Sequence, residues 1–315
     1  MRKVAAAVGA ACAACGALVS FRWLRRTRED RRWEDAAYPG KRLNIEGVTL
    51  HYEEKGSGKP LVMVHGFGGS TFSFRYQLEE FSHDYRCIAV DLKGFGYSER
   101  VKGGDYSLSE QARLVLRALD LLGVDRFVLM GHSMGGDVSM RVAAMAPDRV
   151  EKLILVATAT GQKLWVMPRL PFLRPILNFF IRASAPRYAK RLFYDSNLVD
   201  HKAIIEGYRQ TARIKGSRNT VWEMWNGVRA DKLIDYKRIR MPTLILWAEK
   251  ERILPLPSMA LWWLRRKLRH AEVVKIPRTG HLLLEERPEA ANAAIRRFLQ
   301  GASEDQVREA ALAVA

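Results

Sequence analysis

The sequence predicts an α/β fold with a mostly parallel sheet, helices on both faces of that sheet and an inserted helical segment. Short apolar runs alternate with longer amphipathic segments over most of the 315 residues, as in a sheet whose strands are joined by helices. Several runs are apolar at every position, which is typical of parallel strands covered on both faces. The alternation stops over residues 158–240 and resumes at Pro242, which indicates one core interrupted by an insertion.

The first part of the core begins with an antiparallel pair of strands. Residues 41–54 alternate apolar and polar side chains around Glu46-Gly47, and we expect two strands joined by a tight turn. The next strand, at 61–64, ends in a glycine-rich loop at 65–69. The elements expected after this loop are a helix at 71–82, a strand at 86–92, a helix from the Ser107–Glu110 capping box to Leu122, a strand at 127–130 with the helix after it, and a strand at 153–157.

Residues 158–240 are expected to form a helical cap. Aromatic side chains are frequent there, and prolines divide the segment into short helices. Residues 163–191 carry seven basic side chains and no acidic one among bulky apolar residues. This part either rests on an anionic bilayer or covers the core of the cap itself.

The core pattern resumes after the cap. The expected elements are a strand at 243–247, a helix at about 256–269, a strand at 272–276 and a helix at 288–299. The last fifteen residues are expected to be an exposed helical tail. The predicted organisation is thus a leader at 1–33, a core at 38–157 and 241–300, a cap at 158–240 and a C-terminal tail at 301–315.

The start of the chain has the pattern of a membrane anchor. An uncharged, alanine-rich run at 4–21 is followed by six arginines up to residue 32, interspersed with tryptophan. Arginines on this side of the run predict that the following domain lies in the cytoplasm, associated with the membrane. Two alternatives are a cleaved signal or lipoprotein leader around Ala13-Ala14-Cys15-Gly16, which implies export, and a helix that lies on the membrane surface.

The charge balance indicates an anionic partner. There are 52 Lys and Arg against 34 Asp and Glu, which gives a net charge of +18. No zinc-finger, RRM or helix-turn-helix pattern is present, and the basic residues cluster beside aromatic ones. We therefore expect an anionic membrane surface as the partner and no nucleic acid. Two of the three cysteines lie in the leader and Cys87 lies in a predicted strand, so no disulfide framework is expected.

Residues 126–147 contain the strongest chemical signal. A short strand runs directly into a helix that begins at Met134 and ends before Pro147. Between them lies Gly131-His132-Ser133-Met134-Gly135, a G-x-S-x-G motif whose glycines permit a sharp turn that lifts a serine hydroxyl clear of the sheet. The motif alone recurs by chance, but its place between a strand and a helix predicts that Ser133 is a nucleophile.

The loop at 65–69 suits the second requirement of acyl transfer. That reaction places negative charge on an oxygen, and each backbone N–H group aimed at the oxygen contributes about 3 kcal/mol. A glycine-rich loop exposes such groups because few side chains block them. We expect the N–H groups of Phe67 and Met134 to form the oxyanion hole. Without Ser133, the loop would equally be read as a flexible connection.

A serine hydroxyl needs a base, and the base needs a carboxylate to fix its tautomer. His281 alone among the seven histidines lies in a glycine-marked loop directly after a late strand, where it can reach Ser133. His132 is expected to point away across the turn. Solvated or interfacial positions are expected for the histidines at 51, 83, 201 and 270. The turn after the strand at 243–247 holds two candidate acids, Glu249 and Glu251, of which we select Glu251.

Five ordered motifs resemble the α/β-hydrolase superfamily over most of residues 41–300. They are H-G-F-G-G at 65, D-L-K-G-F-G-Y-S at 91, G-H-S-M-G-G at 131, P-T-L-I-L-W-A-E-K-E-R-I-L-P at 242 and G-H-L-L-L-E-E-R-P-E at 280. The resemblance implies the α/β-hydrolase fold, with an eight-stranded mostly parallel sheet, a cap after the sixth strand, and a triad of Ser133, Glu251 and His281. The family usually has G-x-x-D in the acid turn, and this chain has Ala248 and Glu251 instead.

These features predict a carboxylic ester hydrolase that acts through an acyl-enzyme on a small-molecule ester, with no metal and no organic cofactor. Related haloalkane dehalogenases and epoxide hydrolases resemble this layout but carry aspartate where Ser133 stands. A basic, apolar cap disfavours substrates with a free amino terminus and suits acyl chains or anionic head groups. Two alternatives are a carbon–carbon bond hydrolase of ring-cleavage products, which usually has tryptophan where Leu282 follows His281, and a catalytically silent binding relative.

Overall fold

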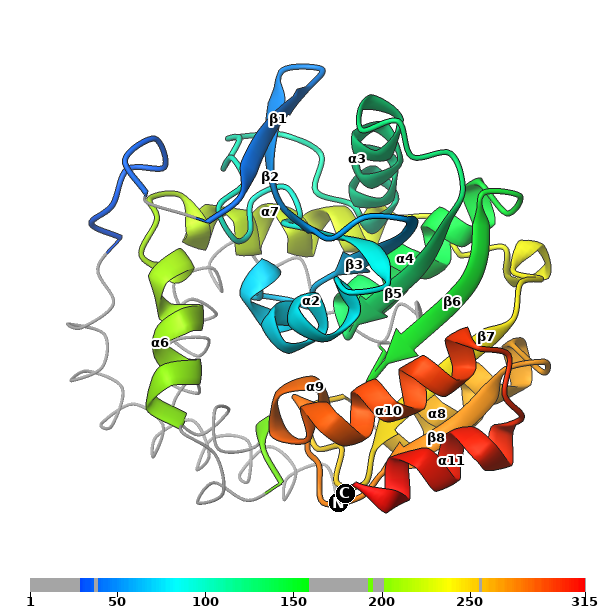
Figure 1. The fold of residues 1–315 in the computed structure, drawn as a ribbon. Coiled ribbons are helices and arrows are strands. Elements are labelled where there is room, and N and C mark those ends of the chain that lie inside the picture. The colour runs from blue at the N-terminus through cyan, green and yellow to red at the C-terminus, as the bar shows by residue number, and fades with distance from the viewer. Residues whose placement is uncertain (1–28, 37–38, 159–191, 195–200, 255–256, 315) are drawn as a thin grey trace, which may run out of the picture.

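The computed structural model describes residues 29–36, 39–158, 192–194, 201–254 and 257–314. Its centre is one eight-stranded sheet in the order β1-β2-β4-β3-β5-β6-β7-β8 (Figure 1). The two strand pairs that contain β2 are antiparallel, and the other five pairs are parallel. The mostly parallel eight-stranded sheet is therefore confirmed. The strands are β1 (Lys41–Ile45), β2 (Val48–Lys55), β3 (Lys59–Val64), β4 (Tyr85–Val90), β5 (Phe127–His132), β6 (Val150–Val156), β7 (Thr243–Ala248) and β8 (Glu272–Ile276).

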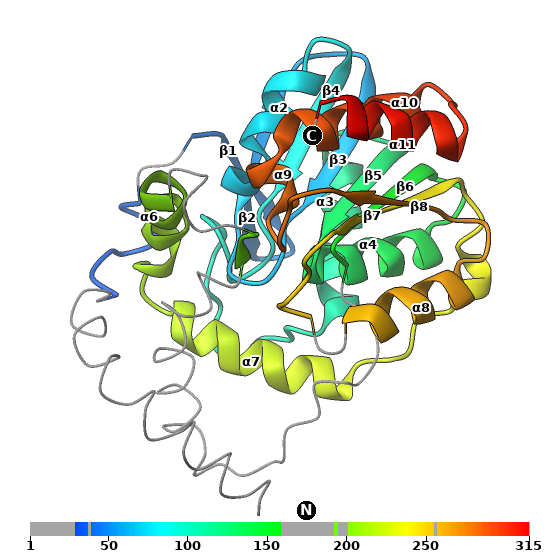
Figure 2. The ribbon, with the colours of Figure 1, turned by 90° about the horizontal axis from the view of Figure 1, so that it is seen from below.

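Helices cover both faces of the sheet (Figure 2). Each face has its own hydrophobic core, and along β3 the residues Val62 and Val64 join the first core while Leu61 and Met63 join the second. This alternation explains why all four positions are apolar. The first core packs against α3 (Leu108–Leu121), α4 (Met134–Met145) and α8 (Pro257–Lys267), and the second against α2 (Arg75–Phe81), α10 (Pro288–Leu299) and α11 (Glu304–Ala313).

The cap leaves the core after β6, and its basic segment at 163–191 lies outside the described residues. Its described parts are residues 192–194, α6 (His201–Ala212) and α7 (Ser217–Ala230), followed by η3 (Tyr236–Arg238). Tyr208 joins α6 to the core. Its hydroxyl donates to the buried carboxylate of Glu285 in α9 (Leu283–Glu286) at 2.5 Å and lies 2.9 Å from the Oγ of Ser73 in η1 (Thr71–Phe74).

The leader predicted at 1–33 lies outside the described residues except for its last five. Those residues, 29–33, pack beside the turn between α6 and α7, where Arg31 forms an isolated β-bridge with Ile214. Residues 29–33, which the sequence analysis assigns to the leader, therefore contact the segment between α6 and α7. Within the ranges that the structure describes, no helix is both long and apolar enough to cross a membrane.

The C-terminal segment is not the exposed tail that the sequence analysis predicts. It forms α11, whose first turn is closed by a capping box between Ser303 and Gln306. Val307 and Ala311 are fully buried in the second core. These two residues are four positions apart, so they form a narrow apolar stripe that packs the helix beside α10 and β8.

Candidate active site

Ser133 lies in a strained turn between β5 and α4. Its φ of 54° and ψ of −118° are rare for residues other than glycine and persist only where packing imposes them. The packing leaves no room for side chains at the two motif glycines. A Cβ on Gly131 would overlap the backbone oxygen of Gly135, and a Cβ on Gly135 would overlap that of Val64. The G-x-S-x-G spacing is therefore a steric requirement of this turn.

Ser133, His281 and Glu251 form a chain of hydrogen bonds. The Oγ of Ser133 lies 2.9 Å from the Nε2 of His281, and the Nδ1 of His281 lies 2.7 Å from the Oε2 of Glu251. All three side chains are buried. They follow β5, β7 and β8, whose carboxyl ends meet at one edge of the sheet. The fold thus brings together the three residues that the sequence analysis selects.

Glu251 is held as a carboxylate. Its Oε1 accepts the backbone N–H groups two and three residues further on, at 2.8 and 3.2 Å. Burial alone would raise the pKa of Glu251, but the imidazole of His281 and these N–H donors outweigh burial and hold the pKa below its ordinary value. The alternative acid, Glu249, is exposed and accepts the Arg278 N–H at 2.7 Å. Of the two candidates, Glu251 is the one that contacts His281.

The glycine-rich loop after β3 lies against Ser133. Gly66 comes so close that a Cβ there would lie 2.9 Å from the Cβ of Ser133. His65 orders this loop, since its Nδ1 donates to the Gly66 carbonyl at 2.7 Å and its Nε2 accepts the Leu92 N–H at 3.0 Å. This pairing selects a neutral tautomer, and burial lowers the pKa of His65 in the same direction.

The two N–H groups predicted to form the oxyanion hole flank Ser133. Phe67 follows Gly66 in the loop, and Met134 is the first residue of α4. The first N–H groups of a helix have no acceptor within the helix, and the helix dipole favours negative charge beside them. The Phe67 side chain is 48% exposed and packs edge-on against Phe95, with 5.7 Å between ring centroids. The oxyanion hole at Phe67 and Met134 therefore stays a prediction.

The sequence analysis predicts that His132 points away from the site, and this prediction is wrong. Its ring lies 5.0 Å from that of His281, and its Nε2 donates to the backbone carbonyl of His281 at 2.9 Å. Burial, and then the neighbouring His281, lower the pKa of His132 to about 3, so its imidazole stays neutral. His132 therefore holds the backbone of His281. The sequence signal that could have indicated this role is the position of His132 directly before Ser133.

Glu286 connects the His281 loop to the cap, and the sequence analysis does not select it. Its Oε1 accepts the Gly280 N–H at 2.7 Å, and its Oε2 accepts the Tyr194 N–H at 2.6 Å. Burial raises the pKa of Glu286 to about 7 although both N–H donors favour the charged form. A pair of acidic residues shortly after His281 was the available signal.

His51 is fully buried, which corrects the prediction that it is solvated or interfacial. Its Nδ1 lies 2.7 Å from the Oδ2 of Asp91 and its Nε2 lies 2.5 Å from the carbonyl of Pro39. Because both partners are acceptors, the ring satisfies them together as an imidazolium. Asp91 also accepts the N–H groups of Thr71 and Tyr97, at 2.6 and 2.7 Å. This pair therefore orders the loops around the end of β4.

The arrangement around Ser133 can pass a proton from the serine hydroxyl to the Nε2 of His281 while Glu251 accepts from the Nδ1. Among the residues that the structure describes, no group of three or more His, Cys, Asp or Glu side chains could hold a metal ion.

An eight-stranded, mostly parallel sheet with a strand, a strained serine turn and a helix at its centre defines an α/β hydrolase. A family model for the alpha/beta hydrolase fold matches residues 59–288. The chain therefore belongs to the α/β-hydrolase family, which supports a hydrolytic activity. It is 30% identical over 279 residues to the uncharacterized hydrolase YugF of Bacillus subtilis. This match covers 84% of this chain and 100% of that protein. Haloalkane dehalogenases and epoxide hydrolases are also relatives, at 27–31% identity.

Two solved structures resemble this one closely. A thermophilic esterase from Thermogutta terrifontis has a TM-score of 0.71 and 27% identity, with 83% of this chain and 99% of the esterase covered. A bacterial membrane phospholipase A, described as a virulence factor, has a TM-score of 0.69 and 25% identity, with 95% of this chain and 98% of the phospholipase covered.

Proposed function

We propose that the chain is a serine hydrolase that cleaves carboxylic esters of apolar acyl groups through an acyl-enzyme, at an anionic membrane surface. One observation carries the proposal. A continuous hydrogen-bonded path runs from the Oγ of Ser133 through His281 to Glu251, with separations of 2.9 and 2.7 Å. A path of this kind activates a hydroxyl that is otherwise a weak nucleophile at neutral pH.

In the proposed cycle, the Oγ of Ser133 attacks the ester carbonyl carbon while His281 takes the hydroxyl proton at Nε2. The carbonyl oxygen becomes an oxyanion that the N–H groups of Phe67 and Met134 stabilise. His281 then gives its proton to the leaving alcohol, and the acyl group stays on Ser133. A water molecule, deprotonated by His281, releases the carboxylic acid and restores the serine. Glu251 remains ionised and stabilises the imidazolium throughout.

An ester is favoured over the substrates of the dehalogenase and epoxide hydrolase relatives. In the family resemblance described above, dehalogenases and epoxide hydrolases carry aspartate at the elbow, where this chain has Ser133. The esterase from Thermogutta terrifontis and the membrane phospholipase A support ester chemistry by similarity. The net charge of +18 supports an anionic surface as the place of reaction.

We also propose that residues 1–28 anchor the chain, with the hydrolase domain on the cytoplasmic side. The supporting pattern is an uncharged run followed by arginines. Carbonate-resistant membrane association of the full chain, lost on deletion of 1–28, is the expected result. The deletion stops at 28 because residues from 29 onward contact the cap. A shortened mature mass would instead assign the segment to a cleaved leader.

Labelling with a fluorophosphonate probe tests the proposed chemistry. The full chain should be labelled, and a Ser133→Ala variant of equal thermal stability should not. A series of p-nitrophenyl esters should show the highest turnover with medium acyl chains, because each buried methylene adds binding energy until the acyl chain is longer than the site can bury. An unlabelled wild-type chain that turns over none of these esters would exclude the proposal.

A further inference from the structure

The exposed side of α8 combines aromatic, thioether and cationic side chains. Met259 is 47% exposed and Trp262 is 58% exposed. Arg265, Arg266 and Arg269 are exposed on the turns that follow. Residues 259, 262 and 266 recur at the spacing of one helical face, so Met259, Trp262 and Arg266 share one stripe, and Arg269 lies in the turn after the helix.

A cavity of about 560 Å³ lies between this helix and the sheet. Trp247 of β7 and Lys275 of β8 line it together with Trp262, Arg265 and Arg266 of α8. Arg269, which follows α8, also lines it. Its volume is in the range of pockets that hold small ligands or the head groups of larger ones. We call the cavity and the exposed stripe beside it the α8 groove.

The α8 groove has an excess of positive charge. Two acids line it, Glu249 and Glu251, but Glu251 is committed to His281 and Glu249 accepts the backbone N–H of Arg278. In the part of the chain that the structure describes, none of the four groove cations forms an ion pair. Arg266 instead lies over the Trp262 ring, 5.6 Å from its centroid, a contact that leaves the guanidinium N–H groups available.

Helix geometry alone does not account for this composition. Basic residues in the last turn of a helix complement its dipole, and this explains Arg265, Arg266 and Lys267. It does not explain Lys275, which comes from β8, or two large apolar side chains exposed on the same stripe. Cations beside exposed tryptophan are instead the composition of helices that lie at a bilayer surface.

We propose that the α8 groove docks the protein on an anionic bilayer, with phospholipid phosphates held by its arginines and Lys275 and with Trp262 and Met259 inserted at the interface. A soluble anion would use the same cations but would have no use for the exposed Trp262 and Met259. Because Glu251 lines the same cavity, docking here places the bilayer beside the proposed triad. The inference rests on the proposed function, because it names the surface on which that hydrolase meets its membrane.

The test uses the full chain with Ser133→Ala, so that lipids stay intact. Its tryptophan emission is measured with vesicles whose acyl chains carry bromine, made of phosphatidylcholine with or without phosphatidylglycerol. The contribution of Trp262 is the difference from the same chain with Trp262→Phe. We expect this contribution to be quenched by vesicles that contain phosphatidylglycerol and not by neutral ones. This readout is local, so it reports on α8 even if the leader holds the chain on the membrane.

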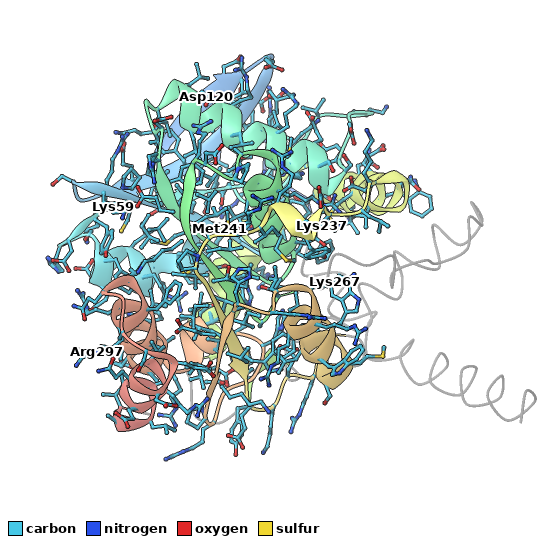
Figure 3. All side chains as sticks on the ribbon, turned by 90° about the vertical axis from the view of Figure 1, so that its right-hand side faces the viewer. Lys59, Asp120, Lys237, Met241, Lys267 and Arg297 are labelled. Carbon is cyan, nitrogen blue, oxygen red and sulfur yellow. The ribbon has the colours of Figure 1, made fainter. Side chains whose placement is uncertain are left out.

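Removing charge provides the matched comparison. The pair Arg265→Gln and Arg266→Gln should reduce the quenching of Trp262 at least fivefold, since each basic residue near an anionic surface changes binding about fivefold. Arg297→Gln, an exposed arginine on α10, should change it less than twofold because α10 covers the opposite face of the sheet. Figure 3 shows Arg297 and Lys267, at the end of α8, on opposite sides of the molecule.

Three outcomes would overturn the proposal. In the first, Trp262 stays unquenched although the chain sediments with anionic vesicles. In the second, neutral vesicles quench Trp262 as strongly as anionic ones. In the third, short duplex DNA shifts the emission of Trp262 and vesicles do not. In chains with Ser133 intact, the arginine variants should keep their turnover of a soluble short-chain ester. If the wild-type chain does not turn over that ester at all, the hydrolase proposal is rejected. The quenching measurement then still tests whether the α8 groove is a docking surface.

Discussion

His132, the residue directly before Ser133, is hydrogen-bonded to His281, whose imidazole contacts Ser133. The Nε2 of His132 donates to the backbone carbonyl of His281 at 2.9 Å, and both rings are buried. The elbow at 131–135 and the loop at 280–281 are therefore joined independently of the contact between Ser133 and His281. A break in this bond would let the His281 backbone shift while the elbow keeps its strained shape.

We expect His132→Phe to lower kcat/KM about tenfold, because the His281 carbonyl is left buried without its donor, a loss of about 1–3 kcal/mol. His132→Gln offers an amide donor and should recover much of the activity. Ester turnover and melting temperature are measured for both. Equal activity of the Phe variant and the wild type would show that this bond does not position His281.

We expect Glu251→Gln to lower kcat about 10³–10⁴-fold, because a neutral amide neither stabilises the imidazolium nor enforces the tautomer. Glu249→Gln is the matched control in the same turn and should stay within a few-fold of wild type, since Glu249 is exposed and bonds Arg278. Steady-state kinetics with a p-nitrophenyl ester measure both. The opposite ranking of the two variants would transfer the acid role to Glu249.

Glu286→Gln should lower kcat about tenfold, because a glutamine has one acceptor oxygen for the two N–H groups of Gly280 and Tyr194. Since Tyr194 belongs to the cap, KM should also change. Glu289→Gln, an exposed acid in the first turn of α10, serves as the control and should change neither constant. A Glu286→Gln enzyme with wild-type kcat would contradict a role in holding the His281 loop.

The buried pair of His51 and Asp91 makes stability depend on pH. Burial disfavours the charged form of both groups, but each group stabilises the charged form of its partner. The pKa of His51 is therefore raised and the pKa of Asp91 is lowered. The contribution of His51 is fully present below its unfolded pKa of about 6.5 and is lost as pH rises through its folded pKa. The contribution of Asp91 is present above about pH 3.9 and is lost as pH falls through its folded pKa.

His51→Gln should therefore destabilise the fold most between about pH 4 and pH 6.5, on the order of 3–5 kcal/mol because it leaves a buried carboxylate unpaired. The difference from wild type should shrink toward about pH 9. Urea unfolding of both chains, within the range of about pH 4 to pH 6.5 and again at about pH 9, measures this difference in the free energy of unfolding. A difference that grows with pH would mean that His51 is neutral in the folded state.

Much of the architecture could be predicted because its causes are local in the chain. A strand covered on both faces must be apolar at every position, so β3 and β5 are visible as runs. The strained turn at Ser133 excludes side chains at Gly131 and Gly135, so its geometry is written into a five-residue motif. The α/β-hydrolase fold was implied by the resemblance of five ordered motifs to that superfamily.

Only the tertiary structure shows in which direction a side chain points and which residues distant in the sequence contact it. Glu249 and Glu251 share one turn, and only the folded turn shows that the first faces solvent and the second faces His281. His51 is polar and α11 is half polar, yet Pro39 and Asp91 hydrogen-bond the buried histidine and one stripe of the helix packs into the second core. Local periodicity carries no record of such partners, because burial is set by the surface that another part of the chain presents.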